Sequence, residues 1–368
     1  MQIPCLFIVT MKIYLVGGAV RDKLLDIAND NTEKDWLVVG SSQEDMLDLG
    51  YRQVGKEFPV FLHPGTQEEY ALARIERKVS KGYAGFEFDT SKGVTLEQDL
   101  SRRDLTINAI AERNGEIFDP FNGQEDLNNG LLKHVSAAFS EDPVRVLRVA
   151  RFSAQFKKFG FKVAHPTHQL MKDMVASGEV DSLTPERVFK ELEKSLTYTT
   201  PSAFFKVLSA CGAYQKVFSP LHPPSTQSHQ NPFEHLDNLV TSEPAIKFSL
   251  WLKDEKPTAI TELCKRIKCP KKHQQLAKLT NQYHQFATQF SQQSNDTILD
   301  FFTKTDALRR KDRFVELLKI FELLKIDISP ITKLRDLLNA IDVSKLDKHN
   351  IAEAIQQEKL SIIKSFRQ

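Results

Sequence analysis

The first third of the chain alternates strand and helix patterns, and this alternation restricts the fold more than any other feature of the sequence. Apolar runs and turn residues predict a strand at 13–16, a helix at 20–25, a strand at 36–39 and a short helix at 43–49. Residues 52–75 alternate around the Pro64-Gly65 turn, which predicts antiparallel strands added to the same sheet. The amino-terminal part is therefore expected to be an α/β layer.

The remaining chain has a different pattern. From about Glu141 onward apolar residues recur with the helical period, and strand patterns are rare. A chain of 368 residues is too long for one ordinary core, so several modules are expected. The predicted fold class is α+β, with a small mixed β-sheet head over residues 11–135, a helical neck over 136–218 and a helical body and tail over 219–368. Residues 1–10 are expected to be an extension that precedes a physiological start at Met11.

Two segments are expected to be loops. Residues 77–92 contain glycines and little apolar periodicity, which predicts a mobile loop. Residues 219–232, rich in proline, serine and other polar residues, predict a linker or a long surface loop.

Composition excludes some classes of protein. The net charge is only +2, so a nucleic-acid site must be a local concentration of Arg and Lys. No stretch is long enough to span a membrane, and the short apolar start lacks the features of a signal peptide. The chain has four cysteines, Cys5, Cys211, Cys264 and Cys269, and their spacing is not that of a zinc site. This predicts reduced thiols, without disulfides, in a cytoplasmic protein.

Two short motifs carry candidate chemistry in the head. Glu33 and Asp35 have the i, i+2 spacing that places both carboxylates on one face of a strand, where they could share Mg²⁺ ions. The Gly17-Gly18 turn would let backbone N–H groups approach nucleotide phosphates, and Arg21 could clamp the same phosphates. In isolation each motif is more typical of an ordinary turn and surface charge.

A third motif opens the helical region. Asp142-Pro143 is a typical helix start, and the arginines that follow lie within an arc of roughly 120° of the helix. These could form a solvated face: Arg145, Arg148 and Arg151. Alternatively, an Asp acceptor beside an Arg donor would accept cytosine and adenine and reject uracil and guanine, because only the first two present an amine next to a ring acceptor.

The segment KIYLVGGAVRDKLL, followed by Glu33-x-Asp35-Trp36 before an apolar strand, resembles the class II tRNA nucleotidyltransferases of the polymerase-β-like superfamily, especially the bacterial CCA-adding enzymes. The resemblance runs from Met11 to about Phe218. It implies two-metal addition and repair of the tRNA 3′-terminal CCA from CTP and ATP, with Mg²⁺ as cofactor. The implied RNA partner is the acceptor and T-arm of tRNA, bound by the body and tail, and no DNA, membrane or specific protein partner is indicated.

The resemblance also assigns residues. It implies that Glu33 and Asp35 are the catalytic metal ligands and that Gly18 and Arg21 contact the nucleotide. Arg103, within the motif R-R-D-x-x-x-N-A, is another implied nucleotide contact. In the neck it implies that Asp142 and Arg145 read the base, with Arg148 and Arg151 holding the nucleotide.

The chain departs from the family at two places. Glu33 stands where an aspartate is expected, after an apparent two-residue insertion, and the extra methylene either reduces activity or is compensated by the insertion. Lys253-Asp254 stands where many bacterial relatives carry the His-Asp of a phosphohydrolase module, so that metal site is expected to be lost.

Three alternatives remain open from the sequence. A bacterial poly(A) polymerase shares the head and the carboxylate strand. A catalytically impaired tRNA-binding relative would follow if Glu33 failed as a ligand. An unrelated α/β protein would require chance matches in the family's motif order.

Overall fold

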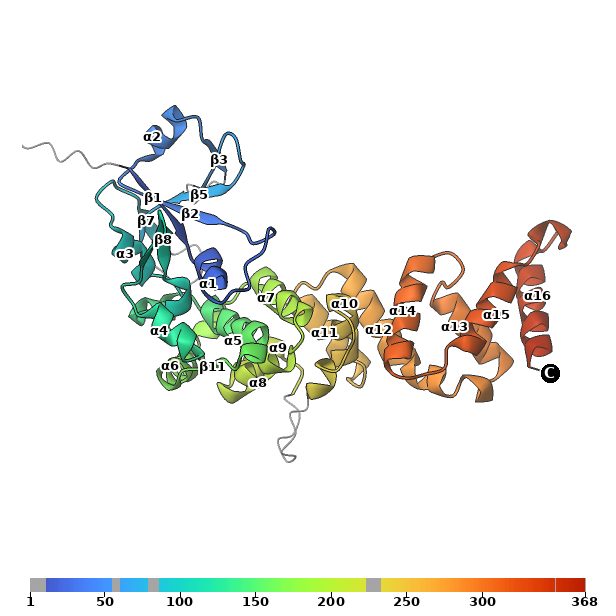
Figure 1. The fold of residues 1–368 in the computed structure, drawn as a ribbon. Helices are drawn as coiled ribbons and strands as arrows, with labels where there is room; N and C mark the ends of the chain where they lie inside the picture. Colours follow the sequence, from blue (N-terminus) through green and yellow to red (C-terminus); the bar gives the residue numbers. More distant parts are fainter. Residues whose placement is uncertain (1–10, 55–59, 79–85, 223–232, 348, 368) are drawn as a thin grey trace, which may run out of the picture. The chain divides into compact units, whose positions relative to one another are not determined.

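The computed structural model describes residues 11–54, 60–78, 86–222, 233–347 and 349–367 (Figure 1). The expected extension at 1–10 lies outside this part of the chain. Two compact units are present: the first comprises residues 1–188 and 203–217, and the second comprises residues 189–202 and 218–368. The domain ranges expected from the sequence remain predictions.

The first unit is built on a seven-stranded sheet with the order β3-β4-β5-β2-β1-β8-β9. Strands β1 and β2 are antiparallel neighbours at its centre, and β2 pairs parallel with β5, so the predicted mixed sheet is confirmed. The strands are β1 (Lys12–Val16), β2 (Asp35–Val39), β3 (Arg52–Val54), β4 (Val60–Leu62), β5 (Glu69–Leu72), β8 (Ala111–Arg113) and β9 (Glu116–Phe118).

Both faces of this sheet are buried by alternating side chains. Leu37 of β2 packs with Tyr14 and Leu100 on one face, whereas the next residue, Val38, packs with Met46 and Phe61 on the other. The covering helices include α2 (Gln43–Asp48) and α3 (Leu96–Ser101), and α1 (Gly18–Leu24) follows β1 directly. A strand buried on both sides holds its ends in place, which matters because the candidate site lies at one end of β2.

The prediction of a loop over 77–92 was wrong at its flanks. Strands β6 (Ile75–Lys78) and β7 (Phe86–Asp89) form an antiparallel two-stranded sheet. Residues 79–85 and most of the predicted linker, 223–232, lie outside the described residues. The two strands are stabilised by pairing with each other, which the weak apolar periodicity of the segment did not indicate.

Helices dominate after the sheet, as predicted. They are α4 (Gly123–Asn128), α5 (Val144–Phe156), α6 (His165–Ala176), α7 (Pro185–Thr197), α8 (Ser202–Ala210) and α9 (Ala213–Phe218), with a short parallel pair of strands, β10 (Leu131–Leu132) and β11 (Lys162–Val163). Helix α5 begins one residue later than predicted, with Pro143 as its N-cap. The Asp142 carboxylate nevertheless accepts a hydrogen bond from the Val144 N–H, so it still caps the helix start.

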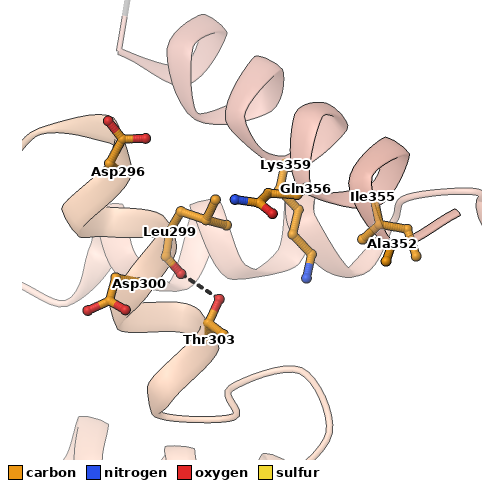
Figure 2. A pocket seen from close by; sticks show the side chains of 8 residues that line it. All are labelled: Asp296, Leu299, Asp300, Thr303, Ala352, Ile355, Gln356 and Lys359. Carbon is orange, nitrogen blue, oxygen red and sulfur yellow. Dashed lines mark hydrogen bonds between the residues drawn. The ribbon is translucent and has the colours of Figure 1, made fainter. Parts of the chain in front are cut away.

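The second unit is helical. Helix α12 packs against α10, α11 and α14, and α16 packs against α13 and α15. Between α13 and α16 lies an open hollow of about 430 Å³ lined by Asp296, Asp300, Thr303, Gln356 and Lys359 among others (Figure 2). The helices are α10 (Pro244–Trp251), α11 (Pro257–Arg266), α12 (Lys271–Thr288), α13 (Asn295–Lys304), α14 (Lys311–Leu323), α15 (Ser329–Asn339) and α16 (Ile351–Phe366). Over the described residues, no helix combines the length and apolar character needed to cross a membrane.

Candidate active site

The turn between β1 and α1 needs glycine at its first position. Gly17 has φ +70° and ψ −125°, a conformation that side-chain-bearing residues rarely adopt, and its N–H donates to the Ile110 carbonyl over 3.1 Å. A Cβ atom at Gly17 would lie 2.8 Å from the Arg103 Nη1 atom. The turn is therefore shaped so that the Arg103 guanidinium can lie directly against the backbone.

Asp35 lies beside this turn because of the strand register. It is the first residue of β2 and pairs antiparallel with Val16, the residue before Gly17. Glu33 precedes the strand and is exposed, so the prediction that one strand carries both carboxylates was wrong. Asp35 is thus fixed by the sheet, whereas Glu33 reaches the site from irregular chain.

The electrostatics of Asp35 favour a cation. Loss of hydration on partial burial raises the pKa of its carboxyl group. The positive charge of Arg103 lowers this pKa, and the negative charge of Glu33 raises it. A divalent cation would relieve the repulsion between the two carboxylates, and carboxylate oxygens are ligands that Mg²⁺ prefers. The donor set therefore fits a magnesium ion.

One N–H donor of Arg103 has no hydrogen-bond partner among the described residues. Its Nη1 atom donates to the Asn108 carbonyl and its Nη2 atom to Asp99 Oδ2, both over 3.3 Å. Its Nε atom is buried and has no hydrogen-bond partner among the described residues. A buried unsatisfied donor is costly, so this atom suits a hydrogen-bond acceptor such as a phosphate oxygen or a ribose oxygen.

Arg21 is buried inside the first unit. Its Nη1 atom donates to Asn108 Oδ1 over 2.5 Å, and its Nε atom donates to Asp22 over 2.8 Å. Its guanidinium also lies over the Phe156 ring of α5, 4.9 Å from the ring centroid. These contacts join α1 to α5, and a phosphate contact by Arg21 remains a prediction.

Asp104 links the head motif to α5. Its carboxylate accepts hydrogen bonds from Arg148 Nε over 2.7 Å and from Asn108 Nδ2 over 2.9 Å. Burial alone would raise the pKa of Asp104, but Arg148, Asn108 and Arg145 together hold it well below its usual value. Asp104 is therefore a buried, ionised acceptor at the junction of two motifs.

The arginines of α5 do not form the solvated face that was one reading of their spacing. Arg145 is buried and donates to the Ala138 carbonyl over 2.7 Å and the Arg102 carbonyl over 2.5 Å. Arg151 is also buried and lies over the Phe152 ring, 4.1 Å from its centroid. Because Arg102 adjoins Arg103, the contact of Arg145 brings the predicted base reader and the Arg103 motif together.

Comparison with known proteins identifies the family to which the chain belongs. Residues 13–133 match the family described as "Poly A polymerase head domain", and residues 160–224 match "Probable RNA and SrmB- binding site of polymerase A". The chain is 43% identical to a CCA-adding enzyme of Coxiella burnetii strain RSA 331, over 97% of this chain and 96% of the relative. The chain belongs to the CCA-adding enzyme family.

A second relative supports this membership, and a solved structure shares the fold. A multifunctional CCA protein of Pseudoalteromonas atlantica is 46% identical over 84% of each chain. A solved CCA-adding enzyme, in its apo form II, shares the fold with a TM-score of 0.67 at 19% identity, covering 96% of this chain and 88% of that one. The predicted α+β fold and the predicted nucleotidyltransferase class are confirmed.

Three functional candidates were missed by the sequence reasoning. Asp104 and Asn108 stood within the quoted R-R-D-x-x-x-N-A motif, whose spacing could have indicated a shared role, but only Arg103 was assigned. Arg187 was not singled out from the sequence, yet it contacts Asp142 directly. Its partner is 45 residues away in the sequence, and no local pattern reports such a contact.

In the second unit, Lys253 and Asp254 form an ion pair, and Asp254 Oδ1 lies 3.2 Å from His284 Nε2. The described part of the chain contains no group of three His, Cys, Asp or Glu side chains that could hold a metal ion. The loss of the phosphohydrolase site remains a prediction.

Replacing Asp104 by alanine is expected to destabilise the protein by about 3 kcal/mol at neutral pH, because it removes a buried carboxylate that accepts hydrogen bonds from both Arg148 and Asn108. Chemical denaturation measures this change. Folding lowers the pKa of Asp104, so its contribution is complete above its unfolded pKa of about 4 and is lost as the pH falls toward the lowered value. Asp173→Ala, at an exposed carboxylate on α6, is the control, and an Asp104→Ala protein as stable as this control would contradict the account.

Proposed function

We propose that this chain builds and repairs the CCA end of tRNA from CTP and ATP, without a nucleic-acid template, at the turn between β1 and α1. The observation that carries this proposal is that Asp35, the Gly17 turn and Arg103 lie together at one end of the central strands β1 and β2. Family membership supports the activity, and the geometry suggests how each group contributes.

Glu33 and Asp35 are the proposed ligands of Mg²⁺. When bound, the ions supply the positive charge that activates the attacking 3′-hydroxyl of tRNA and stabilises the leaving pyrophosphate. Asp35 is the better-placed ligand because the central strand fixes its backbone. Glu33 compensates for its different length through the irregular chain that carries it.

The nucleotide is held by groups around the turn. The backbone of Gly17-Gly18 has no side chain to block close approach of phosphates, and the unsatisfied Nε atom of Arg103 donates to the nucleotide. Asp142 accepts a hydrogen bond from the base amine, and Arg145 donates to the neighbouring ring acceptor. Arg148 and Arg151 support the nucleotide from the same helix, and the tRNA itself is bound by Lys and Arg of the helical body in a salt-dependent way.

Incubation with tRNA that lacks its terminal CCA tests the proposal. With CTP, ATP and Mg²⁺ the product is expected to stop three nucleotides beyond the substrate, and EDTA is expected to abolish extension. A long A tail would instead identify a poly(A) polymerase. Binding of tRNA without incorporation at any Mg²⁺ concentration would identify an impaired relative.

A further inference from the structure

The carboxylate of Asp142 is oriented by an arginine on another helix. Arg187 of α7 approaches it with both terminal nitrogens: Nη1 donates to Oδ1 over 3.1 Å, and Nη2 donates to Oδ2 over 2.7 Å. Arg145, the residue expected to act beside Asp142, is bonded to backbone carbonyls instead. The two predicted base readers are thus held by different partners.

The hydrogen bonds of Asp142 leave one acceptor position open. Each carboxylate oxygen offers about two lone-pair directions. Oδ1 already accepts from Arg187 Nη1 and from the Val144 N–H over 3.1 Å, whereas among the described residues Oδ2 accepts only from Arg187 Nη2. The remaining direction therefore belongs to Oδ2.

We propose that Arg187 is a positioning residue that turns Asp142 so that Oδ2 presents this open acceptor to the exocyclic amine of cytosine or adenine. The inference rests on the proposed function of Asp142 and deepens it. Uracil and guanine would place a carbonyl oxygen against the same carboxylate. Two hydrogen-bond acceptors repel each other, so these bases bind less well. Arg187 thereby contributes to selectivity without touching the base.

The two-point geometry explains why an arginine serves here. A guanidinium fork fixes the plane of a carboxylate, whereas a lysine ammonium binds as a point charge and leaves the carboxylate free to rotate. The side chains of Arg187 and Asp142 are only 29% and 19% exposed, so solvent screens the pair less than it would a surface pair. The neighbouring Val188 is buried, which anchors this turn of α7.

Kinetics of single-nucleotide addition to truncated tRNA test the proposal. The variants are Arg187→Met, which removes the fork, and Arg187→Lys, which keeps only the charge. Lys190→Met, at an exposed position of the same helix, is the matched control. For each protein, kcat and KM are measured with CTP, ATP, UTP and GTP, and thermal melting checks that the fold is retained.

Arg187→Met is expected to raise KM for CTP and ATP about tenfold and to reduce discrimination against UTP and GTP by a similar factor, with a smaller effect on kcat. Arg187→Lys should recover the KM only in part, and Lys190→Met should match the natural protein. Unchanged discrimination in Arg187→Met, or a lower KM that would mark the pair as inhibitory, would overturn the inference. Asp142→Ala separates the two levels: if it loses discrimination while Arg187→Met retains it, only the role of Arg187 fails, whereas retention by both removes the base-reading proposal itself.

Discussion

Asp35→Ala is expected to reduce nucleotide incorporation into tRNA by roughly a thousandfold or more, equivalent to about 4 kcal/mol of transition-state stabilisation. Asp35 is the one proposed metal ligand fixed by a paired strand, and it lies opposite Val16 at the glycine turn. Without it, an ion at the site has no rigid anchor, and the developing charge on the hydroxyl and pyrophosphate goes unbalanced. Single-turnover incorporation from CTP measures the loss.

Two variants make this result specific. Asp30→Ala removes an exposed carboxylate from the chain that precedes β2 and is expected to retain activity. Glu33→Asp restores the residue typical of the family and is expected to change activity far less than Asp35→Ala, because Glu33 lies outside the strand. Full activity of Asp35→Ala would show that the metal site is elsewhere.

Gly17→Ala is expected to lower incorporation by about a hundredfold. The new Cβ atom would lie 2.8 Å from Arg103 Nη1, so the guanidinium must move and its Nε donor loses its place beside the turn. Misplacing a substrate-positioning group by about 1 Å can cost this much in rate. Initial rates of CTP addition to truncated tRNA measure the effect.

Gly50→Ala is the control for alanine at a position of positive φ. Gly50 also has a positive φ, +84°, but a Cβ atom there would meet nothing within 4 Å. Both variants are strained by a conformation that alanine disfavours, whereas only Gly17→Ala displaces Arg103. Equal rates for the two variants would refute the role given to the contact between Gly17 and Arg103.

The elements of the head were predictable because local patterns determine them. The apolar run that ends at Val39 predicted a strand, and the structure confirms it as β2. Because side chains alternate along a strand, Leu37 and Val38 pack into the cores on opposite faces of the sheet. The same reasoning failed for Glu33, since the i, i+2 spacing does not say where the strand begins. It also failed for β6 and β7, which are ordered by pairing with each other.

The partners in the site were less predictable than its residues. The motifs identified Asp35, Arg103, Asp142 and Arg145 as candidates, but not the contacts that orient them. The partner of Asp142 is Arg187, which is distant in sequence and lies on a separate helix. Such contacts depend on how helices pack, and side-chain spacing within one segment carries no information about them.

Competition among all four nucleotides tests the central claim most directly. Truncated tRNA is incubated with Mg²⁺ and equal concentrations of ATP, CTP, GTP and UTP, and the 3′ ends of the products are sequenced. A site that reads bases through Asp142 and Arg145 predicts ends that read C-C-A and then stop. Ends that contain U or G as often as C or A, or that continue as a run of A, would contradict it.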